Sequence, residues 1–156
     1  MLAEELAAGK VRSVVAGADT RAGSVRAALA EVPDEAAVIL VHDAARPLVS
    51  DDVIGRVLAP LSDGYDGAVP VLPLADTVKR VQRDEVVETL DRDGLVVSQT
   101  PQAFLADALR RAAAGEGTDC ASLVESQGGR IKAVEGDPRL LKVTSAEDLE
   151  LVASWL

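Results

Sequence analysis

The stretch that most constrains the fold reads V-I-L-V-H-D-A-A-R-P, from Val38 to Pro47. Its four consecutive apolar residues, Val38 to Val41, favour a strand buried on both faces inside a parallel sheet. Because polar residues end this strand, Asp43 is expected at the carboxyl edge of the sheet, where open α/β folds bind their ligands. Arg46 follows closely and carries a fixed charge that suits phosphate oxygens. Asp43 and Arg46 are therefore the first candidates for a functional site.

The same spacing has a plainer interpretation. Asp43 can cap the following turn, Arg46 can extend into solvent and His42 can pack, because a D-x-x-R pair by itself is a weak motif. Spacing alone leaves both interpretations open. Ser-His-Asp chemistry through His42, the only histidine, is disfavoured because no nucleophile elbow accompanies it.

Length and charge limit the classes of partner. The 156 residues, 48% of them hydrophobic, suffice for one ordinary core, so residues 1–156 are expected to form a single domain. A formal charge of -10 would repel nucleic acids and anionic membranes, and neither is expected as a partner. A phosphate ligand would need a site that is locally basic.

The single cysteine and the lack of a long apolar run indicate the cytoplasm. Cys120 alone forms neither an internal disulfide nor a zinc cluster. No apolar run approaches the ~18 residues of a membrane span, and the start M-L-A-E-E-L is acidic where a signal peptide is basic. We expect a cytoplasmic protein.

Strand and helix patterns alternate through the first half of the chain. This alternation, with short connections, predicts a parallel sheet with helices on its faces. The expected elements are a helix over Met1–Gly9, a strand over Val11–Ala16, a helix over Gly23–Glu31, the strand over Val38–Val41, a helix over Asp52–Ala59 and a strand over Gly67–Val71.

The pattern then changes to a hairpin. Two runs with strand character, Thr77–Gln82 and Val86–Leu90, flank a turn. A hairpin of this size is only marginally stable alone in water, so we expect it to pack against another surface, such as that of a partner subunit. After it we expect strands over Leu95–Ser98, Ile131–Val134 and Leu140–Val143, and helices over Phe104–Ala114, from a Thr118-Asp119 cap through Ser126, and from a Ser145 cap with Asp148 in the capping-box position.

Short polar clusters follow several of the expected strands. If they converge, they form a basic, hydroxyl-lined cup around one carboxylate, which is what a phosphate-transfer site needs. Each cluster alone is equally typical of a solvated turn or an edge strand, so the spacing leaves the reaction class open. The clusters are Asp43 with Arg46, Thr77 with Lys79 and Arg80, Asp91 with Arg92, Gln99 to Gln102, and Lys142 with Thr144.

The ordered set of motifs resembles one family. The motifs are V-H-D-A-A-R-P from Val41, V-P-V from Val69, A-D-T-V-K-R-V from Ala75, T-L-D-R from Thr89, Q-T-P-Q-A-F from Gln99, T-D at Thr118, E-G-D-P from Glu135 and K-V-T-S-A-E-D-L from Lys142. In order and spacing the chain from about Val11 to its end is similar to the 2-C-methyl-D-erythritol 4-phosphate cytidylyltransferases.

The resemblance implies an enzyme that joins CTP to methylerythritol phosphate and releases pyrophosphate in non-mevalonate isoprenoid biosynthesis. It implies a Rossmann-like α/β nucleotidyltransferase sheet with helices on both faces. It also implies that an antiparallel β-arm, about residues 76–98, embraces a second subunit to form a homodimer.

The resemblance also implies roles for single residues. Asp43 would help to hold Mg²⁺, and Arg92 and Lys142 would be catalytic by aiming the substrate phosphate at the α-phosphorus. The residues expected around the cytidine nucleotide are Asp19, Ser24, Ala44 and Arg46, and those expected around methylerythritol phosphate are Thr77, Arg92, Thr100 and Lys142. If the arm crosses to the partner, Thr77 and Arg92 act in the neighbouring site.

One part of the family pattern is missing. Members open with a glycine-rich loop after the first strand, whereas Met1 to Val15 contains only Ala7-Ala8-Gly9-Lys10, without spaced glycines. The expected fold is therefore N-terminally truncated. Three hypotheses follow: a truncated cytidylyltransferase, which we favour; a non-catalytic binding or dimerising protein; and a cytidylyltransferase for a pentitol phosphate such as ribitol 5-phosphate. For the polypeptide as written we expect little or no turnover and an exposed sheet edge.

Overall fold

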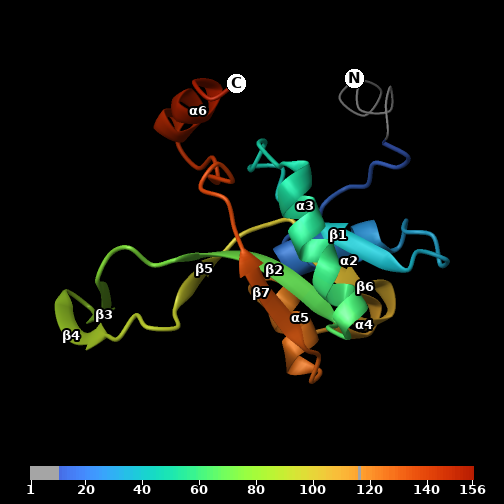
Figure 1. Ribbon diagram of the computed structural model, residues 1–156, viewed down its shortest axis with the longest axis horizontal. Coiled ribbons are helices and arrows are strands. Elements are labelled where there is room, and N and C mark those ends of the chain that lie inside the picture. The colour runs from blue at the N-terminus through green and yellow to red at the C-terminus, as the bar shows by residue number, and fades with distance from the viewer. Residues whose placement is uncertain (1–10, 116) are drawn as a thin grey trace.

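The computed structural model describes residues 11–115 and 117–156, and its main sheet is mixed and five-stranded (Figure 1). β6 lies between β1 and β2 and is antiparallel to both, β5 pairs antiparallel with the last residues of β2, and β7 runs parallel to β2. These strands are β1 (Val38–Val41), β2 (Gly67–Pro73), β5 (Val96–Ser98), β6 (Gln102–Leu105) and β7 (Ile131–Glu135).

Helices cover both faces of the sheet, as expected for the α/β class. Successive residues of β6 show this: Ala103 packs with Val57 of α3, while Phe104 packs on the opposite face with Leu109 of α4 and Val124 of α5. The helices are α2 (Arg21–Leu29), α3 (Asp51–Leu58), the 3-10 helix η1 (Ala59–Asp63), α4 (Ala106–Ala112), α5 (Cys120–Ser126) and α6 (Ala146–Ala153).

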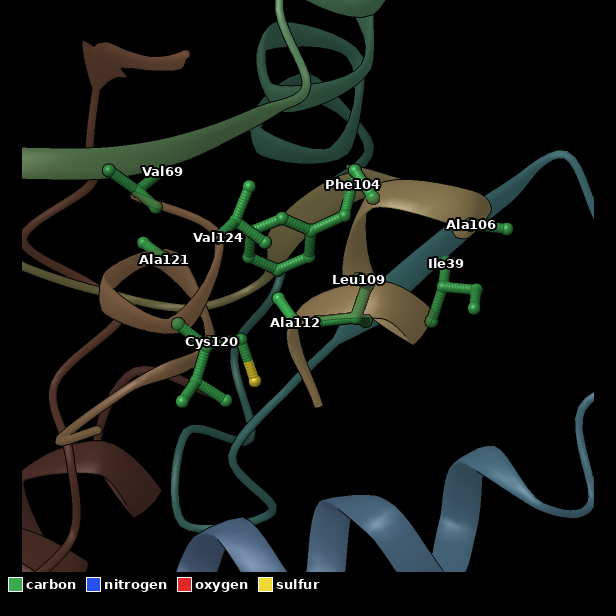
Figure 2. Packing of buried hydrophobic residues seen from close by; sticks show 11 residues of the cluster. Ile39, Val69, Phe104, Ala106, Leu109, Ala112, Cys120, Ala121 and Val124 are labelled. Carbon is green, nitrogen blue, oxygen red and sulfur yellow. The ribbon is translucent and has the colours of Figure 1, made fainter. Parts of the chain in front are cut away.

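The larger core cluster is centred on Phe104, whose side chain is fully buried (Figure 2). Its ring lies among Val69 of β2, Val124 of α5 and Leu109 of α4, and Ile39 of β1 belongs to the same cluster. Burying an aromatic ring and its aliphatic neighbours supplies most of the driving force for holding these elements together. This cluster fixes β6 beside β1, and with it the site described below.

The predicted hairpin is confirmed as a two-stranded arm that projects from the main sheet (Figure 1). It consists of β3 (Val78–Gln82) and β4 (Glu85–Leu90), which pair only with each other among the described strands. The paired residues Val81 and Val86 are 54% and 60% exposed. The arm therefore presents apolar side chains to solvent.

The prediction of a parallel sheet is wrong for most pairs, since among the described strands only β2 and β7 are parallel. The chain returns from the arm in the opposite direction and inserts β6 between β1 and β2. β1 is also not buried on both faces, because Ile39 is its one buried residue. The predicted helix over Phe104–Ala114 starts later, since Phe104 and Leu105 belong to β6.

Two further predicted strands are not found. Residues 11–16 have strand composition but no described strand lies beside them to form a ladder. Over Leu140–Val143 the backbone makes isolated bonds instead of a ladder: the N–H of Leu140 donates to the Asp137 carbonyl, and that of Val143 donates to the Ala45 carbonyl. The predicted helix over Met1–Gly9 lies outside the described residues.

Candidate active site

Asp43 lies just beyond the end of β1 and is surrounded by three cations from distant parts of the chain. Its carboxylate oxygens are 3.2 Å from Lys142 Nζ, 3.6 Å from Arg21 Nη2 and 3.8 Å from Arg46 Nε. One negative and three positive groups leave this point strongly basic, although the chain as a whole carries a charge of -10. The local excess of positive charge suits a ligand with phosphate groups.

Local structure brings each cation to this point. Thr20 caps α2 by accepting a hydrogen bond from the Gly23 N–H, so Arg21 is the first residue of the helix and faces Asp43. The turn after β1 is closed by the Arg46 N–H, which donates to the Asp43 carbonyl at 2.9 Å. The bond from the Val143 N–H to the Ala45 carbonyl, 2.8 Å long, anchors the segment that carries Lys142.

The charges around Asp43 keep it ionised. Burial raises the pKa of the Asp43 carboxyl, but the hydrogen bond from Lys142 and the three positive charges lower it by more, so its pKa lies below the ordinary value. Burial lowers the pKa of Arg46 and the charge of Asp43 opposes this, yet a guanidinium stays protonated at neutral pH. Asp43 and Arg46 are therefore both charged at neutral pH.

A second network ties Thr100 to the same turn. The Asp43 N–H donates to Thr100 Oγ1 at 3.0 Å, and Thr100 Oγ1 lies 3.1 Å from His42 Nδ1. His42 Nε2 lies 2.8 Å from the Arg46 carbonyl, which only accepts, so Nε2 carries a proton. His42 thus contacts both the Thr100 hydroxyl and the Arg46 carbonyl and links the two ends of the loop from Asp43 to Arg46.

These groups line a hollow of about 270 Å³. Besides the charged residues, its wall contains hydroxyl, amide and carboxylate side chains from β5, the β5–β6 connection, β6 and the start of α5. The lining residues are Arg21, Asp43, Arg46, Ser98, Gln99, Thr100, Gln102, Thr118, Asp119 and Lys142. A larger hollow of about 490 Å³ lies near the other end of β1 and is lined by four carboxylates and Arg111, so it offers little to an anionic ligand.

The structure brings together some of the predicted site residues and separates others. Asp43, Arg46, Thr100 and Lys142 all line the 270 Å³ hollow, which is the convergence that the sequence predicted. The predicted residues that do not line it are Asp19, Ser24, Ala44, Thr77 and Arg92.

The separated residues fall into two groups. The first group lies near the charged residues: Ala44 follows Asp43 directly, Asp19 lies two residues before α2, and the Ser24 hydroxyl accepts a hydrogen bond from the Ala18 N–H at 3.0 Å. Thr77 and Arg92 lie where the arm joins the sheet, and Arg92 donates to the Ala75 carbonyl. The second group therefore lies outside the hollow of its own chain.

Sequence reasoning assigned no individual role in the site to six of the lining residues, namely Arg21, Ser98, Gln99, Gln102, Thr118 and Asp119. Arg21 carries no motif of its own, and the one available signal was its position directly after the Thr20 cap. Gln102 and Asp119 belong to motifs that were recognised, but no role was assigned to them. Their roles depend on α5 meeting β6, a contact between segments that local patterns do not reveal.

The carboxylates that line the hollow are those of Asp43 and Asp119. Over residues 11–115 and 117–156 no group of three or more His, Cys, Asp or Glu side chains is placed to hold a metal ion. Mg²⁺ is commonly bound through one or two carboxylates together with substrate phosphates, and Asp43 fits that pattern.

Within the same described ranges, no helix is long and apolar enough to cross a membrane.

Comparison with known proteins gives one consistent result. The family model described as 2-C-methyl-D-erythritol 4-phosphate cytidylyltransferase matches residues 2–156. The chain is 46% identical over 147 residues to the protein of that name from Frankia casuarinae, covering 92% of this chain and 55% of that protein. It is 49% identical over 143 residues to the one from Rhodococcus opacus, covering 89% and 63%.

A solved structure gives the same likeness in three dimensions. The crystal structure of 2-C-methyl-D-erythritol 4-phosphate cytidylyltransferase from Thermus thermophilus superposes with a TM-score of 0.81 at 34% identity, covering 90% of this chain and 71% of that one. The chain thus spans a little over half to about two thirds of the length of the curated relatives it matches.

Proposed function

The chain belongs to the 2-C-methyl-D-erythritol 4-phosphate cytidylyltransferase family, and from this we propose that it serves the transfer of a cytidylyl group from CTP to methylerythritol phosphate in non-mevalonate isoprenoid biosynthesis. In this reaction a phosphate oxygen of methylerythritol phosphate attacks the α-phosphorus of CTP. The bond to the β-phosphate breaks and pyrophosphate leaves. The reaction is a nucleotidyl transfer between two anions.

The observation that carries the proposal is the convergence of Lys142, Arg46 and Arg21 on Asp43. Two anionic reactants repel each other, so a site must supply fixed cations to bring their phosphates into line. Lys142 and Arg46 are placed to do this, and Thr100 adds a hydroxyl at the same wall. Lys142 is proposed to aim the attacking phosphate, and Arg46 to lie beside the nucleotide, with Asp19, Ser24 and Ala44.

Asp43 is proposed to hold Mg²⁺ together with phosphate oxygens of the nucleotide. When bound, this ion would neutralise negative charge on the triphosphate. The lowered pKa of Asp43 supports the role, because a ligand carboxylate must be ionised at neutral pH. Lys142 Nζ and Arg21 Nη2 lie 3.2 Å and 3.6 Å from the Asp43 carboxylate and both line the hollow, so phosphate oxygens held by such an ion would be within reach of both cations.

The arm is proposed to complete the site of a second copy in a homodimer. Thr77 and Arg92 do not line the hollow of their own chain, whereas exposed Val81 and Val86 give the arm an apolar surface to bury. A second copy that receives the arm would gain Arg92 beside its own Lys142. CTP, methylerythritol phosphate and a second copy are therefore the proposed partners, and the cytoplasm is the proposed location.

Calorimetric titration of the chain with methylerythritol phosphate tests the proposal. We expect binding that is stronger than that of ribitol 5-phosphate and that weakens at least about tenfold in Lys142→Met, because a charge-assisted contact to phosphate is lost. A preference for ribitol 5-phosphate would assign the chain to a pentitol phosphate instead. If neither compound binds, the proposed function is contradicted.

A further inference from the structure

The side chains that line the hollow form two chemically different sets, which we call its two halves. The charged half consists of Asp43 and its three cations, whereas the other half carries hydroxyl, amide and carboxylate groups and no positive charge. The members of this second half are Ser98, Gln99, Thr100, Gln102, Thr118 and Asp119. Phosphate groups of a ligand would bind the charged half. The second half would therefore bind a part of the ligand that carries no phosphate.

Gln102 is the most deeply buried member of this second half. Its side chain is 1% exposed, and its Nε2 donates to Asp119 Oδ2 at 2.8 Å and to Ser98 Oγ at 3.2 Å. The carboxylate of Asp119 only accepts hydrogen bonds, so it fixes which end of the amide faces it. Gln102 Oε1 must then point elsewhere, and it has no hydrogen-bond partner in the part of the chain that the structure describes. A buried acceptor without a donor is costly and calls for an explanation.

Asp119 is held rigidly but keeps acceptor capacity. Its Oδ1 accepts a hydrogen bond from the Ser122 N–H at 2.9 Å, which caps α5, and its Oδ2 accepts from Gln102. A carboxylate offers about four lone-pair sites, so these two bonds leave about half of them unused. Asp119 makes no ion pair with any described residue although it lines the hollow. Asp119 can therefore accept further hydrogen bonds from a ligand in the hollow.

We propose that the Gln102–Asp119 pair recognises the hydroxyl groups of the sugar-alcohol substrate and so determines the choice of acceptor alcohol; this rests on the function proposed above. Asp119 accepts a hydrogen bond from a substrate hydroxyl, and Gln102 positions the carboxylate. The phosphate end of the same molecule lies toward Lys142 and Arg46. A molecule with a phosphate at one end and hydroxyl groups at the other matches both halves of the hollow.

The variant Asp119→Asn tests the pair without removing the cap, because asparagine caps helices as well as aspartate does. Its Nδ2 would replace Oδ2 and donate to Gln102, whose amide turns so that Oε1 accepts. The fold is thereby preserved while the acceptor for the substrate hydroxyl is lost. Asp52→Asn, in the first turn of α3 and outside the hollow, is the matched control.

The readout is the ratio of affinities for methylerythritol phosphate and butyl phosphate, which has a similar chain length and no hydroxyl groups. In the unaltered chain we expect methylerythritol phosphate to bind better. In Asp119→Asn this preference should shrink about 10- to 100-fold, the loss of one hydrogen bond to a charged group, while affinity for butyl phosphate stays the same. Gln102→Met should reduce the preference as well, and Asp52→Asn should leave it unchanged.

The possible failures differ from one another. An unchanged preference in Asp119→Asn would overturn the inference while leaving the proposed function intact. An equal loss of both affinities would also overturn it, because the substitution would then act on the phosphate end. If the unaltered chain shows no preference for methylerythritol phosphate, the proposed function fails and the inference fails with it.

Discussion

Lys142 Nζ lies 3.2 Å from Asp43 Oδ2, although one residue follows the first strand of the described chain and the other precedes the last helix. The Lys142 side chain is 49% exposed and that of Asp43 is 20% exposed, so the pair lies at the mouth of the hollow. Each partner has a proposed ligand of its own, a phosphate for the amine and a metal ion for the carboxylate. The ion pair therefore joins the two groups that are proposed to contact the metal ion and the phosphate.

Replacing Lys142 by Met is expected to raise the pKa of Asp43, because burial already raises it and the strongest opposing contribution comes from Lys142. In the unaltered chain the lowered pKa stabilises the fold above the unfolded-state value of about 3.9, and this contribution disappears as the pH falls through the folded-state pKa. The variant should lose about 0.5 kcal/mol of unfolding free energy at pH 7, a small value because the lysine is half exposed, and almost nothing near pH 2.

Urea unfolding at the two pH values, with carbon-detected titration of the Asp43 carboxyl, measures both effects. Lys142→Arg keeps the positive charge and is the control. An Asp43 pKa that is the same in Lys142→Met and in the unaltered chain would show that the ion pair is absent in solution.

Thr100→Val is expected to destabilise the fold by about 1–3 kcal/mol, because it leaves the Asp43 N–H without its acceptor beside a residue that is only 4% exposed. Valine has nearly the same shape, so the change isolates the hydroxyl. Thr100→Ser keeps the acceptor and should cost less. Chemical denaturation compares the three proteins, and equal stability of the valine and serine variants would contradict the role given to the hydroxyl.

Local features of the sequence predicted local structure well. The capping box at Ser145 and Asp148 is present, as is the Asp119 cap of α5, because each depends on residues only three positions apart. The hairpin turn and the position of Asp43 at a strand end were also predicted correctly, because both depend on residues that are close together in the sequence. The family resemblance is confirmed by the match over residues 2–156, because its motifs are short segments whose order survives in the sequence.

Features that depend on contacts between distant segments were not predictable in this way. Phe104 and Leu105 adjoin an alanine-rich helical pattern, yet they form a strand because β1 and β2 flank them and the core buries the Phe104 ring. Arg21 joins the site because the start of α2 meets the end of β1, a contact that no local pattern indicates. The residues after Leu140 lack a ladder for a similar reason, since no described strand pairs with them.

Gly67→Ala is expected to destabilise the fold by about 1–3 kcal/mol, because a Cβ at this position of β2 would lie 2.5 Å from Phe104 Cδ1 and 2.9 Å from both the Ala103 carbonyl oxygen and Ile131 Cδ1. The backbone oxygen cannot move away without disturbing the pairing of β2 with β6.

Gly55→Ala is the matched control, since a Cβ there meets nothing within 4 Å and the residue lies inside α3. It should stabilise the fold by about 0.5–1 kcal/mol through helix propensity. Thermal or urea unfolding measures the two variants side by side. Opposite signs are expected, and destabilisation by both would mean that any added methyl group is harmful.

The proposed homodimer would account for both the apolar surface of the arm and the separation of Arg92 from the hollow. Val86→Asp places a charge at a side chain that is 60% exposed, so it should not unfold the chain, but it would be costly in an apolar interface. We expect sedimentation velocity to show a dimer for the unaltered chain and a monomer for this variant.

Leu149→Asp on α6 is the matched control, because Leu149 is 58% exposed and lies outside the arm, and it should leave the dimer intact. The monomeric variant should also bind methylerythritol phosphate at least about tenfold more weakly, since the guanidinium of Arg92 would no longer reach a neighbouring hollow. If the unaltered chain is already a monomer, the proposed dimer is wrong. If the monomeric variant binds methylerythritol phosphate with full affinity, Arg92 does not contribute to substrate binding. In that case the 270 Å³ hollow would have to hold its ligand with the residues of one chain alone.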